Sequence, residues 1–230
     1  STVVERLVVM TGGQRHVRNR WYVSVRTPVY RDKEAAMQLA IFPLRLNLLP
    51  DGVLPLRIFE PRYMRMIAES SRRGMGLCLL GKSLDGGYSP LLTVGTRVEI
   101  IDFDLLADNT LSVTLKGVER FKIHAMEVEP DGLLSAEVQL LPGWHHEPLQ
   151  PEQHILAEKL GLLFDEHPSY AAYYPTPQWT DVCWVVQRWL EVLPLEAEEK
   201  FSLMASNDYH EALHFLLQAV QEEEAAVRQH

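Results

Sequence analysis

Between residues 39 and 141, short aliphatic runs alternate with turn residues, and this pattern leaves few folds open. The expected strands cover residues 39–44, 53–59, 76–80, 91–94, 97–106, 110–116, 121–128 and 133–141. Leu111, Val113 and Leu115 alternate with polar residues, as in a strand that buries one face. So many short strands joined by tight turns predict a β-barrel or a β-sandwich.

One helix is expected to interrupt these strands. Pro61 suits the first turn of a helix, where its missing N–H would have no partner anyway. Met64, Ile67 and Ala68 then provide an apolar stripe at helical spacing. Gly74 is the type of residue that commonly follows a helix end, so the helix is predicted to stop there.

The composition changes near Pro142, and the apolar spacing becomes helical beyond it. Helices are expected at 152–166, 178–192, 195–205 and 208–224. The predicted organisation is a β domain over 39–142, a mobile linker rich in proline and histidine over 143–152, and a helical domain over 153–230. Residues 1–38 precede these parts, either as a genuine extension or as residues upstream of the natural start.

Charge is unevenly distributed along the 230 residues. Residues 1–38 carry a net charge of +4, whereas the remaining residues carry −13. An acidic body is repelled by phosphate backbones, which weighs against nucleic acid as the main partner. No apolar run approaches the roughly 20 residues that span a bilayer. The two cysteines, Cys78 and Cys183, lie far apart in apolar surroundings, so we expect free buried thiols and a cytoplasmic protein.

Five segments, in order along the chain, resemble the N-terminal substrate-binding domain of the Lon ATP-dependent proteases. They are Ile41–Leu44, Val53–Tyr63, Val94–Thr96, Leu115–Ile123 and Leu190–Lys200. The resemblance implies an α+β protein in which a PUA-like β-barrel precedes a small helical domain. It also implies a non-catalytic module that holds polypeptide, without the ATPase and peptidase parts, as a stand-alone Lon-domain protein.

The same resemblance sets the expected partners. These are an unfolded or tagged polypeptide or a partner protein, with no cofactor, no nucleic acid and no membrane; a homodimer is left open. The PUA-like fold also suggests RNA binding, but the acidic charge of residues 39–230 disfavours this hypothesis. Among the matching residues, Glu60, Arg62, Glu119 and Arg120 are expected to form polar pairs that fix the fold, with partner contact as the alternative. Gly95 and Gly117 are expected to permit turns.

A zinc-hydrolase motif is the main competing signal. His210, Glu211 and His214 satisfy HExxH, in which both histidines bind zinc and the glutamate acts as general base. A third ligand is needed, and Glu222 would lie about 12 Å along the same helix from His214. An upstream ligand, from His145, His146 or His167, stays open. The alternative function is therefore a zinc metallohydrolase. We favour the interpretation that His210 and His214 are ordinary histidines at the edge of the helix's apolar face.

Two further patterns carry less weight. Residues 76–83 satisfy GxxxxGK[ST], but the four middle residues are Leu, Cys, Leu and Leu, which favour a strand over a phosphate-binding loop. In the helical domain, large aromatic residues suit either a core or a peptide-binding surface. Tyr173, Tyr174 and Trp179 are the candidate partner-binding residues.

Overall fold

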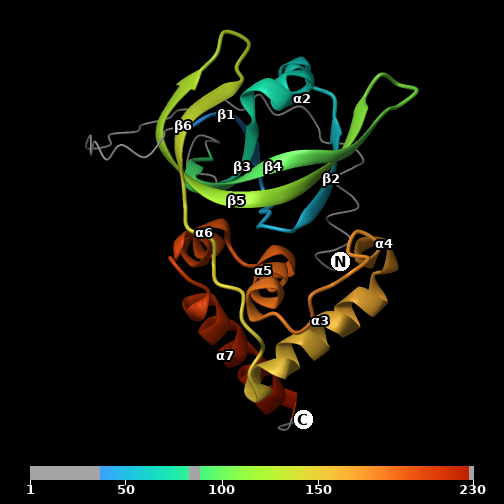
Figure 1. Cartoon of the computed structure of the whole chain (residues 1–230), viewed down its shortest axis with the longest axis vertical. Helices are drawn as coiled ribbons and strands as arrows, with labels where there is room; N and C mark the ends of the chain where they lie inside the picture. The colour runs from blue at the N-terminus through green and yellow to red at the C-terminus, as the bar shows by residue number, and fades with distance from the viewer. Residues whose placement is uncertain (1–36, 83–88, 228–230) are drawn as a thin grey trace.

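The computed structural model describes residues 37–82 and 89–227. Its strands are β1 (Met37–Leu44), β2 (Val53–Ile58), β3 (Met75–Leu80), β4 (Leu91–Leu105), β5 (Leu111–Val128) and β6 (Leu134–Leu140). Its helices are α2 (Pro61–Arg73), the 3-10 turn η1 (Pro151–Gln153), α3 (His154–Glu166), α4 (Pro168–Ala171), α5 (Val182–Val192), α6 (Ala197–Ala205) and α7 (His210–Val227). The strands curl into a barrel, and α3–α7 pack against one end of it (Figure 1).

The sheet closes into a ring because β5 pairs with three other strands. The six strands follow the order β2-β5-β4-β3-β1-β6, and an additional β5–β6 pairing completes the circle. β1 and β3 run parallel, whereas the other pairs are antiparallel. The predicted α+β class, with a barrel followed by helices, is therefore confirmed.

β4 and β5 are each one long, bent strand where the sequence suggested two short ones. Gly95 and Gly117 lie inside these strands, so the expectation of turns at both positions is wrong. An added Cβ at Gly95 would lie 2.3 Å from the carbonyl oxygen of Leu77, and one at Gly117 would lie 2.1 Å from that of Leu49. Both glycines are needed because another backbone segment passes too close for a side chain.

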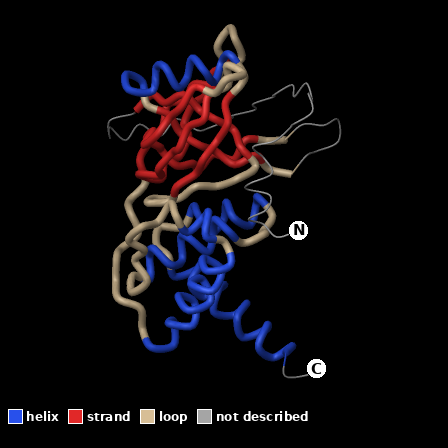
Figure 2. The backbone as a smooth tube through the Cα atoms, turned by 90° about the vertical axis from the view of Figure 1, so that its right-hand side faces the viewer, coloured by secondary structure: helices blue, strands red, loops and turns tan. Residues whose placement is uncertain are grey.

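Helix α2 covers the end of the barrel that faces away from the helical domain (Figure 2). It begins with Pro61 and is followed by Gly74, which has a φ of 74°, so both predicted boundaries are confirmed. Tyr63 and Met66 are its buried side chains, and they join the apolar core inside the barrel. Arg73, in the last turn, lies near the negative end of the helix dipole.

A second core joins the helices to the other end of the barrel. Leu49, Val53 and Leu79 from the barrel belong to the same buried cluster as the apolar residues of α3, α5, α6 and α7. A buried ion pair lies at this junction, formed by Arg188 and Glu191 of α5. The barrel and the helices therefore share apolar packing in addition to the chain that connects them.

The connecting segment is anchored, although the sequence suggested a mobile linker. Trp144 is buried, and its Nε1 donates a hydrogen bond to the carbonyl of Ser206 (3.0 Å). Leu149 is also buried, and its N–H donates to the carbonyl of Thr180 (2.9 Å). Because apolar side chains hold it at both ends, this segment is part of the helical domain's packing.

Both cysteines are free and buried, as predicted. Burial raises the pKa of the Cys183 thiol to about 12, so this group stays a neutral thiol at physiological pH. In the part of the chain that the structure describes, no helix has the length and apolarity to cross a bilayer.

Candidate functional site

The GxxxxGK[ST] letters fall on a buried strand. Residues 75–80 form β3, and every one of them is buried. Their backbone groups pair with β1 on one side and β4 on the other. A phosphate-binding loop needs free N–H groups before a helix, so the strand predicted from the sequence is confirmed; Ser83 lies outside the described residues.

The HExxH residues lie on α7, as predicted, and all three are exposed. His210 stacks on the ring of Tyr209, and its Nδ1 lies 2.9 Å from Oδ1 of Asp208. Glu211 accepts a hydrogen bond from Ser206 Oγ (2.7 Å). Across residues 37–82 and 89–227, no three His, Cys, Asp or Glu side chains gather as a metal site.

The upstream histidines proposed as a third ligand do not gather into a metal-type group with the HExxH residues among the described parts of the chain, and His145 is exposed in the segment before α3. His146 pairs with Asp181, which also caps α5 through the N–H of Cys183. His167 is the residue between α3 and α4. The geometry of the described residues therefore gives the zinc-hydrolase alternative no added support.

The candidate partner-binding aromatics differ in their accessibility. Tyr174 is buried and its hydroxyl accepts a hydrogen bond from the N–H of Val53 (3.0 Å); burial raises its pKa to about 12. Trp179 packs edge-on against Phe164 at 5.0 Å. Tyr173 is 37% exposed. A role of these residues in partner binding stays a prediction, and Tyr173 is the most accessible of the three.

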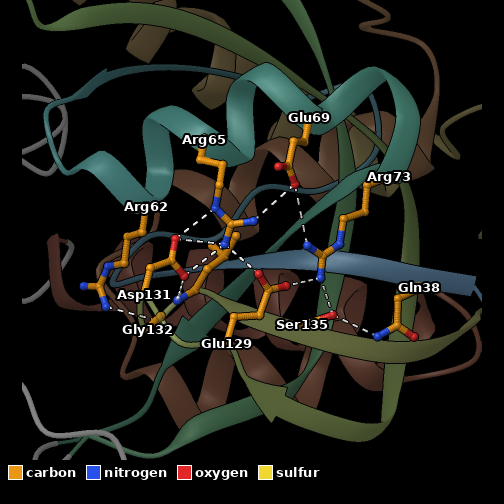
Figure 3. Close-up of polar contacts among 10 residues, drawn as sticks. Gln38, Arg62, Arg65, Glu69, Arg73, Glu129, Asp131, Gly132 and Ser135 are labelled. Atoms are coloured by element: carbon orange, nitrogen blue, oxygen red, sulfur yellow. Dashed lines mark hydrogen bonds and ion pairs between the residues drawn. The ribbon is translucent and has the colours of Figure 1, made fainter.

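A polar cluster ties α2 to the hairpin between β5 and β6 (Figure 3). Arg65 contacts Glu129 (2.6 Å) and both oxygens of Asp131 (2.9 Å each). Arg73 also pairs with Glu129 and donates to Ser135 Oγ (2.5 Å). Because each of these arginines faces carboxylates of its own chain, we interpret the cluster as a clamp on α2.

The clamp predicts a specific sensitivity to acid. The hydrogen bond from Arg73, and then that from Arg65, holds the pKa of Glu129 below its ordinary value. A lowered folded-state pKa stabilises the fold above the unfolded value, near 4.3, and this contribution disappears as pH falls through the folded value. We expect Glu129→Gln to cost about 1–2 kcal/mol at pH 7, with the deficit shrinking below about pH 4.

Thermal unfolding followed by circular dichroism from pH 3 to pH 8 checks this expectation. Glu127→Gln is the matched control, because Glu127 is exposed near the end of β5, two residues before Glu129. An equal loss of stability in both variants at pH 7 would refute the clamp.

Exposed apolar side chains gather on the part of β4 that extends beyond β3. The β3–β4 pairing ends at Met75 and Val98, so residues 99–105 pair with β5 alone among the described strands. We call residues 99–105 the β4 edge. Ile101, Phe103 and Leu105 on this edge are 53%, 70% and 63% exposed. The hairpin that carries them projects to the right in Figure 1.

Comparison with known protein families decides what kind of domain this is. Residues 38–222 match the family model of the ATP-dependent protease La (LON) substrate-binding domain. The chain belongs to this family. The match confirms the resemblance that the segments between Ile41 and Lys200 suggested.

Curated relatives of this Lon-type domain are much longer proteins. The chain is 28% identical over 116 residues to protein cereblon from Danio rerio, which covers 48% of the chain and 27% of that relative. It is 24% identical over 151 residues to Lon protease from Xanthomonas oryzae pv. oryzae, which covers 63% of the chain and 17% of that relative. The chain thus spans less than a third of the length of either relative.

Solved structures share the fold over most of the chain. A Lon N-terminal domain protein from Xanthomonas campestris is 31% identical with a TM-score of 0.61, covering 79% of this chain and 98% of that one. The N-terminal domain of a Lon protease from the Mycobacterium avium complex has a TM-score of 0.54 at 16% identity, covering 79% and 96%. The second likeness shows the fold alone.

Within the Lon-type domain, the charged residues of the matching segments have local structural partners. Arg62 pairs with Glu60 (2.6 Å) and Glu119 pairs with Arg97 (2.9 Å). Arg120 is buried and donates to the carbonyls of Met204 (2.6 Å), Ser206 (2.8 Å) and Pro142 (2.7 Å). Arg120 therefore fixes the barrel to the helices through backbone carbonyls, a fold-fixing polar role of the kind that the sequence suggested.

The β4 edge was missed from the sequence, although a signal is present. Ile101, Phe103 and Leu105 alternate with acidic residues, which is the pattern of an ordinary half-buried strand. Whether these three side chains are buried depends on how far the neighbouring strand β3 extends along β4. A local sequence pattern does not contain that information.

Proposed function

We propose that this Lon-type domain binds extended or unfolded polypeptide, or an exposed segment of a partner protein, without making or breaking bonds. The observation that carries the proposal is the match of residues 38–222 to a substrate-binding domain. The exposed apolar residues of the β4 edge support it, because solvent-exposed large apolar groups gathered on one element are typical of interaction sites.

Binding of one protein in its unfolded and folded forms tests the proposal. Reduced and carboxamidomethylated lysozyme is the unfolded probe, and native lysozyme is the folded probe with the same sequence. Fluorescence anisotropy with labelled probes should give a Kd at least about tenfold lower for the unfolded form. Because both forms carry the same basic side chains, attraction to the acidic domain alone would not produce this difference.

The outcome against the proposal is equally plain. Equal Kd values for the two forms, or no binding of either, would remove it. Mass spectrometry of the probe after incubation tests the absence of bond chemistry. Cleavage of the probe that disappears in a His210→Ala variant, together with stoichiometric zinc in the wild type, would instead support the zinc-metallohydrolase hypothesis.

A further inference from the structure

One side of the β4 edge lacks a neighbouring strand among the described residues. The last β3–β4 pair joins Met75 to Val98, and β5 then remains the partner of β4 on one side. Within the described residues, the other side of 99–105 has no strand beside it. Backbone N–H and C=O groups on such a side are free to pair with an added strand.

Natural sheets protect an edge of this kind with proline, charged side chains (above all lysine), β-bulges or a very short strand. The opposite edge of the same sheet, β2, contains Pro55, and proline discourages the addition of a strand. The β4 edge, with the sequence EIIDFDL, contains neither proline nor lysine, and its charged residues are all acidic. They therefore repel another acidic strand but attract a basic one. The contrast between the two edges favours the β4 edge as the one that accepts a partner.

The two faces of the β4 edge differ in chemistry. Phe103 lies opposite Val113 and Leu105 lies opposite Leu111 on β5. Directly opposed residues share a face of the sheet, so Phe103 and Leu105 extend the barrel's apolar surface onto the edge. Ile101 lies at a register shift between β4 and β5, where a strand bends and presents its side chain differently.

The other face of the edge is acidic. Asp102 lies opposite Thr114 and Asp104 lies opposite Ser112. Both aspartates are exposed, and neither takes part in an ion pair with another residue that the structure describes. Nearby arginines are already engaged, since Arg97 pairs with Glu119 and Arg57 with Asp108.

We propose that the β4 edge binds basic amphipathic polypeptide as an added β-strand, in which apolar residues alternate with lysine or arginine. Main-chain hydrogen bonds hold the segment, Phe103 and Leu105 contact its apolar face, and Asp102 and Asp104 attract its basic face. The net charge of −13 over residues 39–230 disfavours acidic segments at long range. This inference rests on the proposed function, because it names the substrate class and the surface.

Peptides of about ten residues test the charge and main-chain contributions separately. One alternates valine with lysine, a second alternates valine with glutamate, and a third repeats the first with N-methylated amides on alternate residues. We expect the lysine peptide to bind at least about tenfold more tightly than either of the others. The N-methylated peptide keeps the charge and the apolar surface, so its loss of affinity reports the main-chain hydrogen bonds.

Variants of the full chain locate the site. Phe103→Ser should weaken binding of the lysine peptide at least about tenfold, and the double variant Asp102→Lys with Asp104→Lys should reverse the preference towards the glutamate peptide. Leu162→Ser is the matched control, since Leu162 is 63% exposed but lies on α3, and it should retain wild-type affinity. Because all these side chains are exposed, unchanged circular dichroism is expected.

Several results would overturn the inference. One is that the wild type and Phe103→Ser bind unfolded lysozyme with equal affinity. The proposed function would then stand, but the binding site would lie outside the β4 edge. Another is that the wild type is a dimer and binds no peptide, while Phe103→Ser is a monomer. That result would assign the β4 edge to contact with a second copy of the chain. If the wild type binds neither peptide nor unfolded lysozyme, the proposed function fails as well.

Discussion

Glu191→Ala is expected to lower the free energy of unfolding by about 3–5 kcal/mol, because it leaves a buried charge without its partner. Arg188 is fully buried, and its Nε and Nη2 atoms lie 2.8 and 2.9 Å from the two carboxylate oxygens of Glu191. The same carboxylate accepts a hydrogen bond from the N–H of Leu49 (2.7 Å), on the barrel side of the junction. Truncation therefore leaves the guanidinium without its carboxylate partner and the Leu49 N–H without its acceptor in the interior.

Urea unfolding monitored by tryptophan fluorescence measures this effect as a lower midpoint. Glu158→Ala is the control, because Glu158 is exposed on α3, and a change within about 0.5 kcal/mol is expected there. The double variant Arg188→Met with Glu191→Leu removes both charges and should recover part of the loss. Recovery stays partial because the carbonyl of Pro50, which accepts from Arg188 (2.8 Å), also loses its donor. A midpoint for Glu191→Ala equal to that of the control would contradict the assignment.

Gly117→Ala is expected to destabilise the barrel by at least about 3 kcal/mol. The new Cβ would lie 2.1 Å from the carbonyl oxygen of Leu49 and 2.8 Å from its carbon. Both are backbone atoms, so no side-chain rotation relieves the contact. Moving the backbone apart would break the hydrogen bonds that join Gly117 to Asp51 and Gly52, each 2.9 Å long.

Gly161→Ala provides the opposite control for the same chemical change. Gly161 lies in the middle of α3, and no atom lies within 4 Å of an added Cβ. Alanine there should raise stability by about 0.5–1 kcal/mol, since it restricts the unfolded chain and favours helix. Thermal unfolding of both variants should therefore give shifts of opposite sign. A shift of the same sign and size in both would mean that the close approach at Gly117 is unimportant.

Local chemistry explains which parts of the fold were predictable. Pro61 and Gly74 act through their own backbones, so the sequence indicates the ends of α2 correctly. The helices after residue 150 follow from apolar spacing, with starts that differ by two to four residues from the structure. The buried aromatic cluster around Phe164 also follows from composition, but which ring stays exposed depends on packing between helices.

Long-range contacts explain what the sequence did not indicate. Gly95 and Gly117 resemble turn residues until the segments that cross them, at Leu77 and Leu49, are known. Arg120 is expected from the sequence to take part in a polar pair, but which groups it contacts is not local information, because two of its carbonyl partners, Met204 and Ser206, lie more than 80 residues away in the chain. The candidate β4 edge is defined by the end of a neighbouring strand, which is likewise a non-local property.

The pairing of the first strand with the last has a consequence for how the protein is made. β1 is hydrogen-bonded to β6, and 97 residues separate Gln38 from Ser135, whose side chains are also joined. On a ribosome, β1 therefore emerges long before this partner exists, whereas its parallel neighbour β3 follows much sooner. Non-local pairings of this kind slow folding. Ring closure through β6 should accordingly be the late step, with the apolar residues of β1 open to solvent or to chaperones until it occurs.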